Sequence, residues 1–264
     1  MKPANRKLSL TGAAIMVLLT SCKGTLSDVY DEPPAEKIHT AAGQLYIDAS
    51  DWGYWHFLDL KTLADKVNAD PDFNTSSEWE SIAIPTAETA TEDTAGKNGI
   101  YTYWYDIFGE GTSHHKYRSF YPTAPQPEPD EWSIAVHRNN LRTNGGSIAA
   151  TGLHDIDGIP LSTDYISSLN FTDDSWNETD VWVTQDKMLS GLIGNQGITI
   201  NHVGSSWLRI DIPPMPPAFT LDDNVFIIRL NDGTYGALQL VDYQSPLGTK
   251  CCLTINYRYP LSVQ

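Results

Sequence analysis

Cysteine is scarce in this chain of 264 residues, which contains only three. One of them, Cys22, follows an uncharged N-terminal segment, and the other two, Cys251 and Cys252, are adjacent. Neighbouring side chains of an extended strand point to opposite faces, so the adjacent pair is not expected to form a disulfide. No disulfide framework is predicted, and a hydrophobic core has to stabilise the folded chain.

Positive charge is also scarce. The chain has 17 Lys and Arg residues against 33 Asp and Glu residues, a formal net charge of −16. A surface this acidic repels phosphate backbones and anionic headgroups. Nucleic acid is therefore excluded as an expected partner, and contact with a membrane is expected only through a covalent lipid.

A catalytic constellation is the third absence. The sequence pattern offers no nucleophile beside a base, no paired carboxylates and no metal-binding spacing. Asp155-Ile156-Asp157-Gly158 resembles the start of a calcium loop, but no ligands follow at the required spacing, which favours an acidic surface turn. His137 ends a strand pattern and is interpreted as a buried structural histidine. We expect no enzymatic activity.

Long apolar runs are confined to the N-terminus. Residues 8–21 carry no charge and follow Lys2, Arg6 and Lys7. A run of about 14 residues is shorter than the roughly 20 needed to cross a hydrocarbon core. Residues 1–21 are therefore predicted to be a secretory leader that is cleaved off.

The end of the leader, Leu19-Thr20-Ser21-Cys22, has the form of a lipobox, in which the cysteine thiol accepts a diacylglycerol. Cys22 is therefore predicted to be lipidated and to become the new N-terminus; an ordinary leader with a coincidental cysteine is the alternative. Removing 21 residues from 264 leaves a mature chain of 243, with 14 basic residues against 33 acidic ones and a net charge of −19.

The mature chain is predicted to consist of a tether and one domain. Residues 22–42 are polar, lack periodicity and contain Pro33-Pro34, which is typical of a flexible linker. Residues 43–262 show no internal repeat and no second linker, so they are expected to form a single domain.

Apolar residues alternate with polar ones through much of this domain. The alternation recurs at residues 44–47, 55–57, 101–106, 132–137, 198–200, 207–212 and 253–257. A period of two predicts strands. Residues 225–230 and 235–241 flank Asp232-Gly233, which predicts a β-hairpin. Short helices are predicted only at residues 60–67 and 186–193.

Two polar segments interrupt the strand pattern. Residues 68–98 are rich in Thr, Ser, Ala and acidic residues, and residues 121–130 alternate proline with polar residues. Polar sequence spaced by proline is typical of an exposed, extended loop. Neither segment is expected to contribute much to a core.

Several separated motifs resemble one known family. The run Trp132-Ser-Ile-Ala-Val-His-Arg138, followed by Arg142-Thr-Asn-Gly-Gly146, is similar to the signature of the HmuY family of Bacteroidetes haem-binding lipoproteins. Further similar blocks, in the family's order, are Tyr46-Ile-Asp-Ala-Ser50, Trp207-Leu208, residues 225–243 and Ile255-Asn-Tyr257. The similarity extends over residues 45–260, with residues 61–129 as a long insertion.

The resemblance implies a fold and a function. The expected fold is all-β, with packed antiparallel sheets and few short helices. The expected protein is lipid-anchored to the outer membrane, exposed at the cell surface, and holds haem (iron protoporphyrin IX) between two loops. The resemblance also implies transfer of haem to a TonB-dependent outer-membrane receptor for iron and haem uptake.

The resemblance also points to candidate iron ligands, which family members supply as histidines or methionines from two loops. Ile212 occupies the position of a second histidine ligand, but Met215 follows among four prolines and is the candidate there. Met188 is the candidate in the first loop, and His202, which shares a strand face with Ile198 and Ile200, ranks behind it. The alternative for Met215 is that it fills an apolar gap.

A glycan-binding surface lipoprotein is the alternative function. In that case exposed tryptophan faces would stack on sugar rings, and Trp52, Trp55, Trp104 and Trp182 are the candidates. The two hypotheses differ in whether Met188 and Met215 converge across one cleft.

Overall fold

The computed structural model describes residues 40–85, 88–89, 102–106, 116–122, 125–185, 192–212, 214 and 216–264. The predicted leader at residues 1–21 and Cys22 lie outside the described residues, as do most residues of the predicted tether at 22–42. Among the described residues, no helix combines the length and the apolar character that crossing a membrane requires.

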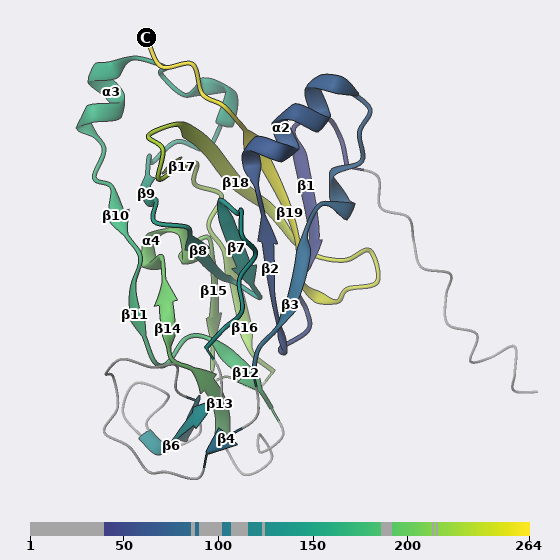
Figure 1. Cartoon of the computed structure of the whole chain (residues 1–264), viewed down its shortest axis with the longest axis vertical. Helices are drawn as coiled ribbons and strands as arrows, with labels where there is room; N and C mark the ends of the chain where they lie inside the picture. Colours follow the sequence, from purple (N-terminus) through teal and green to yellow (C-terminus); the bar gives the residue numbers. More distant parts are fainter. Residues whose placement is uncertain are drawn as a thin grey trace, which may run out of the picture. The chain divides into compact units, whose positions relative to one another are not determined.

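The largest sheet has six antiparallel strands (Figure 1). In spatial order they are β1 (Gln44–Asp48), β19 (Lys250–Arg258), β18 (Tyr235–Gln244), β17 (Phe226–Arg229), β9 (Ser147–Ala150) and β10 (Thr172–Asp173). The predicted hairpin is confirmed, because β17 pairs with β18 and Phe226 lies opposite Leu238. A tight turn at Gly233, which has a φ of 85°, joins these two strands, and this conformation favours glycine.

A four-stranded sheet shares a core with this sheet. Its order is β3 (Glu80–Ala83), β2 (Tyr54–Leu58), β7 (Ile134–His137) and β8 (Asn140–Thr143). Leu58 and Val136 from the four-stranded sheet pack in one cluster with Phe226 and Ile228 from the six-stranded sheet. The helix α2 (Leu60–Ala69), close to the predicted 60–67, adds Leu63 to the same cluster.

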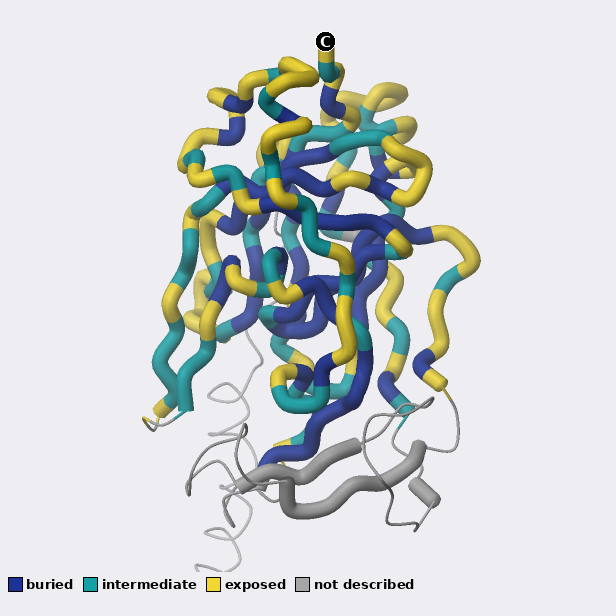
Figure 2. The backbone as a smooth tube through the Cα atoms, turned by 90° about the vertical axis from the view of Figure 1, so that its left-hand side faces the viewer, coloured by how far each residue is buried: buried dark blue, intermediate teal, exposed yellow. Residues whose placement is uncertain are grey.

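Alternation along the strands builds further layers. Trp55 and Phe57 of β2 point away from the first core and pack with Val183 and Ile200 in a second cluster. On the other side of the six-stranded sheet, Ile227 packs with residues around η4 (Ile156–Gly158) and α3 (Thr163–Ser168) in a third cluster. Figure 2 shows the buried strands running through the centre of the described chain. Because side chains alternate along a strand, β2 and β17 each bury side chains on both faces of their sheets.

Three further sheets complete the described β structure. One contains β12 (Trp182–Thr184), β13 (Leu192–Gln196), β5 (Thr102–Asp106), β6 (Lys116–Pro122) and β4 (Glu88–Thr89). The others are the pairs β11 (Ser175–Asn177) with β14 (Ile198–Ile200), and β15 (Leu208–Asp211) with β16 (Ala218–Leu221). Every described pairing is antiparallel, which confirms the all-β fold of packed antiparallel sheets.

Three regions differ from the local structure or burial expected from the sequence. A helix was predicted at residues 186–193, but Leu192 and Ile193 belong to β13, because they pair with β5; residues 186–191 lie outside the described residues. Residues 68–98 add more to the core than expected, since Ile84 is buried in the second cluster and Trp79 packs against the first. Within residues 121–130, Gln126 is buried and accepts a hydrogen bond from Gln196 Nε2 at 3.1 Å.

Candidate ligand-binding site

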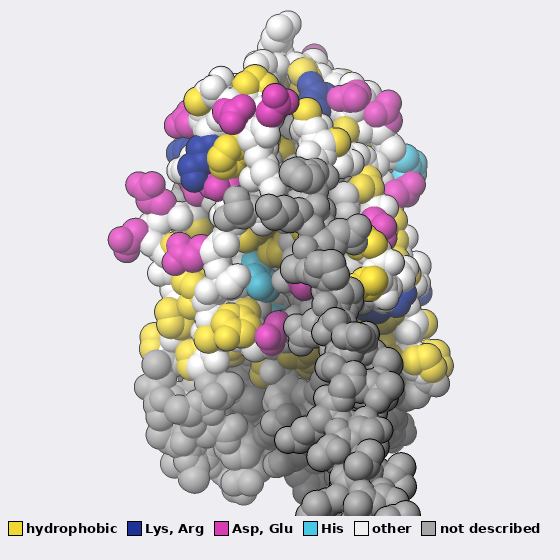
Figure 3. Space-filling model, turned by 90° about the vertical axis from the view of Figure 1, so that its right-hand side faces the viewer, with side chains coloured by type: hydrophobic (Ala, Val, Ile, Leu, Met, Phe, Trp, Pro, Cys, Tyr) yellow, Lys and Arg dark blue, Asp and Glu magenta, His cyan; other side chains and the backbone are white. Residues whose placement is uncertain are grey.

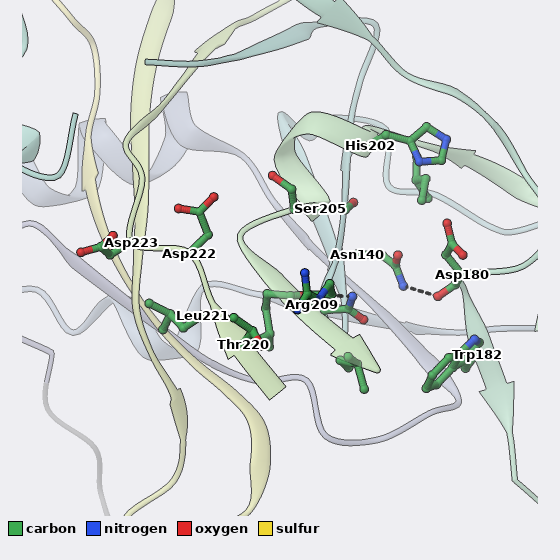
Figure 4. A pocket seen from close by; sticks show the side chains of 15 residues that line it. Asn140, Asp180, Trp182, His202, Ser205, Arg209, Thr220, Leu221, Asp222 and Asp223 are labelled. Atoms are coloured by element: carbon green, nitrogen blue, oxygen red, sulfur yellow. Dashed lines mark hydrogen bonds between the residues drawn. The ribbon is translucent and has the colours of Figure 1, made fainter. Parts of the chain in front are cut away.

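A cleft of about 690 Å³ opens between the β15–β16 hairpin, β12 and the short helix α4 (His202–Ser205) (Figure 4). A cleft of this size suits a small organic molecule or cofactor. Its described lining consists of Asn139, Asn140, Asp180, Trp182, Ile200, His202, Ser205, Ser206, Leu208, Arg209, Ile210, Thr220, Leu221, Asp222 and Asp223.

Trp182 supplies an aromatic wall of the cleft. Its ring stacks on Trp52 with centroids 6.2 Å apart, and the Arg138 guanidinium lies 4.2 Å from the Trp52 ring centroid. Trp182 Nε1 donates to the carbonyl oxygen of Thr179 at 2.9 Å. The stack and this hydrogen bond fix the ring plane, so the wall is formed in advance of any ligand.

His137 anchors the strand that carries Trp182. Its imidazole is fully buried, with Nδ1 2.9 Å from the Tyr54 carbonyl oxygen and Nε2 2.9 Å from the Trp182 carbonyl oxygen. Burial lowers the pKa of His137 to about 4, although both carbonyl contacts act in the opposite direction. The interpretation of His137 as a buried structural histidine is therefore confirmed.

The start of α4 is held by a buried polar network. Asn201 caps the helix, accepting from Gly204 N at 2.9 Å through Oδ1, and its Nδ2 donates to Asp174 Oδ1 at 3.1 Å. Asp174 also accepts from Thr143 N at 2.8 Å. Burial raises the pKa of Asp174.

His202 follows this cap as the first residue of α4 and is exposed. The expectation that it shares a buried strand face with Ile198 and Ile200 is wrong, because β14 ends at Ile200 and the Asn201 cap turns the chain into a helix. His202 instead lines the cleft (Figure 4). Neither the helix nor the cleft was visible in the pattern of alternation.

Acidic side chains stand on two sides of the cleft. Asp180 is held in a turn, where its Oδ2 accepts from Asn177 Nδ2 at 2.7 Å and its Oδ1 accepts from Thr179 Oγ1 at 2.8 Å. Asp222 and Asp223 lie on the opposite side in Figure 4. Sequence reasoning missed Asp180; the Asn177-Glu-Thr-Asp180 pattern of an Asx turn was the available signal.

The two methionine candidates, Met188 and Met215, lie outside the described residues. Met188 falls in the chain between β12 and β13, and Met215 falls between β15 and β16. The strand that precedes each segment lines the cleft, through Trp182 of β12 for the first and Ile210 of β15 for the second. Ligation by either methionine stays a prediction.

Of the described tryptophans expected of a glycan site, one is buried and two stack on each other. Trp55 is fully buried and donates from Nε1 to Gln196 Oε1 at 2.9 Å, so it cannot contact a sugar. Trp52 is partly buried; its ring stacks on that of Trp182, and the Arg138 guanidinium lies 4.2 Å from its centroid. The side chain of Trp104 lies outside the described residues.

Comparison with known families identifies the chain. The family described as HmuY protein matches residues 50–257, most of the chain. The chain belongs to the HmuY family. This confirms the resemblance drawn from the tryptophan-containing and C-terminal motifs. No curated protein matches the chain.

Solved structures agree with this fold. A protein from Bacteroides vulgatus, provisionally described as HmuY-like and haem-binding, is 26% identical, with a TM-score of 0.54, and the match covers 84% of this HmuY-family chain and 96% of that chain. A protein from Bacteroides fragilis, provisionally described as a lipoprotein, is 24% identical, with a TM-score of 0.56 and coverage of 84% and 92%. Apo PinO from Porphyromonas gingivitis is 18% identical, with a TM-score of 0.60 and coverage of 83% and 97%.

Proposed function

We propose that this HmuY-family protein binds haem in the cleft and is a surface lipoprotein rather than an enzyme. The observation that carries the proposal is the position of the cleft. Its walls include β12 and the β15–β16 hairpin, which flank the two segments predicted to supply iron ligands. A relative from Bacteroides vulgatus that is 26% identical is described as haem-binding.

The lining fits a porphyrin in size and chemistry. Ile210 and Leu221, which are partly exposed, add apolar surface beside the Trp182 ring, and the buried Ile200 and Leu208 also border the cleft. A porphyrin needs apolar contact for its two faces. His202 is an imidazole donor already at the cleft. Met188 and Met215 are the proposed axial ligands; thioether sulfur is soft and favours the reduced iron of a bound haem.

The chain's own residues would bind and orient, and no catalytic step is needed. Trp182 is held by Trp52 and His137 and packs against the ligand, while the apolar wall excludes water. We further propose that Cys22 carries the lipid that anchors the protein to the outer membrane at the cell surface. Haem captured there would be passed to a TonB-dependent receptor for uptake.

An absorbance titration of the mature domain with haemin tests the proposal, both oxidised and after reduction with dithionite. Met188→Leu and Met215→Leu keep an apolar side chain of similar volume and remove the sulfur, so they separate ligation from packing. Met215→His restores a ligand at one position. His202→Ala tests the competing ligand.

A saturable Soret shift with sharp bands in the reduced state is expected for the parent. Each Met→Leu variant should lose the sharp reduced bands, and Met215→His should regain a six-coordinate spectrum with altered band positions. Loss of these bands in His202→Ala and in only one Met→Leu variant would assign ligation to His202 and that methionine, and loss in His202→Ala alone would contradict both methionine ligands. Parent spectra identical to those of free haemin in both states would refute haem binding.

A further inference from the structure

Acidic side chains outnumber basic ones in the described lining of the cleft. Asp180, Asp222 and Asp223 line it, and Arg209 is the one Lys or Arg among the described lining residues. Arg209 is already paired, because its Nε lies 2.9 Å from Asp211 Oδ2. This pairing within the β15–β16 hairpin offsets part of its charge. Figure 3 shows another face of the molecule, where acidic side chains are also widespread.

Each of the three carboxylates is held in place by a hydrogen bond or an ion pair. Both oxygens of Asp180 accept hydrogen bonds from its own turn, at 2.7 and 2.8 Å. Asp222 Oδ1 accepts from Asn224 N at 3.0 Å, which holds its side chain at the start of the chain leading into β17. Asp223 Oδ1 lies 2.7 Å from Nδ1 of the exposed His154, which neutralises it only when that imidazole is protonated.

We propose that these aspartates select the class of porphyrin that the cleft accepts, a proposal that rests on haem binding in this cleft. The accepted ligands have one uncharged edge, which enters the cleft, and carry their carboxylates on the opposite edge, in solvent. Iron protoporphyrin IX has this arrangement, with vinyl and methyl groups on one edge and two propionates on the other. A porphyrin with a propionate on every pyrrole ring has no uncharged edge and is rejected.

The physical reason is repulsion between like charges, which salt screens where the aspartates are exposed. An inserted carboxylate would lie between Asp180 on one side and Asp222 and Asp223 on the other, with no unpaired Lys or Arg among the described lining residues. Such an interaction is stronger in a partly apolar cleft than in water. The Trp182 ring and Ile210 offer favourable contact to a vinyl or ethyl edge instead.

The test compares two iron porphyrins by absorbance titration of the mature domain. Iron mesoporphyrin IX has two propionates on one edge and ethyl groups on the other, and iron coproporphyrin III has four propionates around the ring. We expect iron coproporphyrin to bind about tenfold or more weakly than iron mesoporphyrin to the parent. In Asp222→Asn/Asp223→Asn the ratio should fall to about threefold or less.

A control with the same change in charge removes two exposed carboxylates elsewhere. Asp65→Asn/Asp72→Asn makes the same change in net charge near α2, outside the cleft, and should leave the ratio unchanged. Raising the salt concentration from 50 to 500 mM should also narrow the ratio in the parent, because exposed charges are screened. The salt series tests the idea in the parent even if the double variant fails to fold.

The outcomes separate this inference from the proposed function. Equal affinity for both porphyrins in the parent, or a ratio that neither salt nor the Asp222 and Asp223 substitutions reduce, would overturn the selection while leaving haem binding intact. Absence of saturable binding by both haem and iron mesoporphyrin would overturn the proposed function itself.

Discussion

The Nε2 atom of His137 lies 2.9 Å from the carbonyl oxygen of Trp182, so a buried imidazole supports the strand that forms the aromatic wall of the cleft. Nδ1 of the same ring lies 2.9 Å from the Tyr54 carbonyl oxygen. A neutral imidazole donates from one nitrogen only, so one of these two contacts is a hydrogen bond and the other lacks a proton. Protonation would satisfy both contacts, but burial opposes the charge.

The pKa of His137 predicts how stability depends on pH. Burial lowers the pKa from 6.5 to about 4 in the folded protein, so between these values the unfolded chain binds more protons than the folded one. Stability is therefore fully present above pH 6.5 and is lost as the pH falls toward 4, by about 3 kcal/mol in total. His56, whose pKa burial also lowers, contributes in the same direction.

Chemical denaturation at a series of pH values checks this prediction. His137→Gln should flatten the dependence between pH 6.5 and 4, whatever its effect on stability at neutral pH. An unchanged slope in His137→Gln would mean that this imidazole is not buried in its neutral form.

Trp182→Ala is expected to weaken haem binding by about tenfold, because it removes the aromatic wall and the partner of Trp52. Titration with haemin measures the change. Trp176→Ala is the matched control, since Trp176 is 38% exposed on β11 and does not line the cleft. Equal haemin affinities of the two variants would show that Trp182 does not contribute to haem binding.

Gly204→Ala should destabilise the protein by about 1–3 kcal/mol. In an open helix the same change stabilises by about 1 kcal/mol. Here a Cβ atom would lie 2.7 Å from Ile148 Cδ1 and from Leu141 Cδ2, inside the first core, so overpacking outweighs helix propensity. The urea midpoint measures the loss. Gly158→Ala, whose added Cβ would meet nothing closer than 3.5 Å, should change the midpoint little.

The pH dependence of haem binding distinguishes the proposed ligand sets. Thioethers do not titrate near neutral pH, so ligation by Met188 and Met215 predicts nearly constant affinity from pH 7 to 5.5. Affinity should be measured by titration at both pH values, together with circular dichroism to show that the fold persists. A steep loss over this interval in the parent, absent from His202→Ala, would identify His202 as a ligand.

Cys22→Ala should release the protein from membranes, because the thiol that accepts the lipid is removed. Fractionation of cells that produce the parent and the variant, followed by detection of the domain in membrane and soluble fractions, measures the effect. Cys251→Ala and Cys252→Ala control for cysteine loss, since both thiols are buried in the fold. A variant that stays in the membrane fraction would contradict lipidation at Cys22.

Much of the β architecture was predictable because side chains of a strand alternate between two faces. The alternation around Trp55 and Phe57, the Asp232-Gly233 turn and the apolar residues of α2 each encode their element locally. The polar segment at residues 68–98 misled the prediction of the core. Trp79 and Ile84, two of its few apolar residues, pack inward. The overall composition of the segment is polar, so it does not reveal these individual residues.

The sequence alone determined several of the strands, the hairpin and the family, because each depends on residues that are neighbours or on motifs in a set order. Tertiary structure decided the cleft. Asp180 and Asp222 are 42 positions apart, and His137 reaches Trp182 across 45 positions, so no local pattern relates them. Their proximity follows from how the sheets pair and pack, and with it the exposure of His202 and the charge of the site.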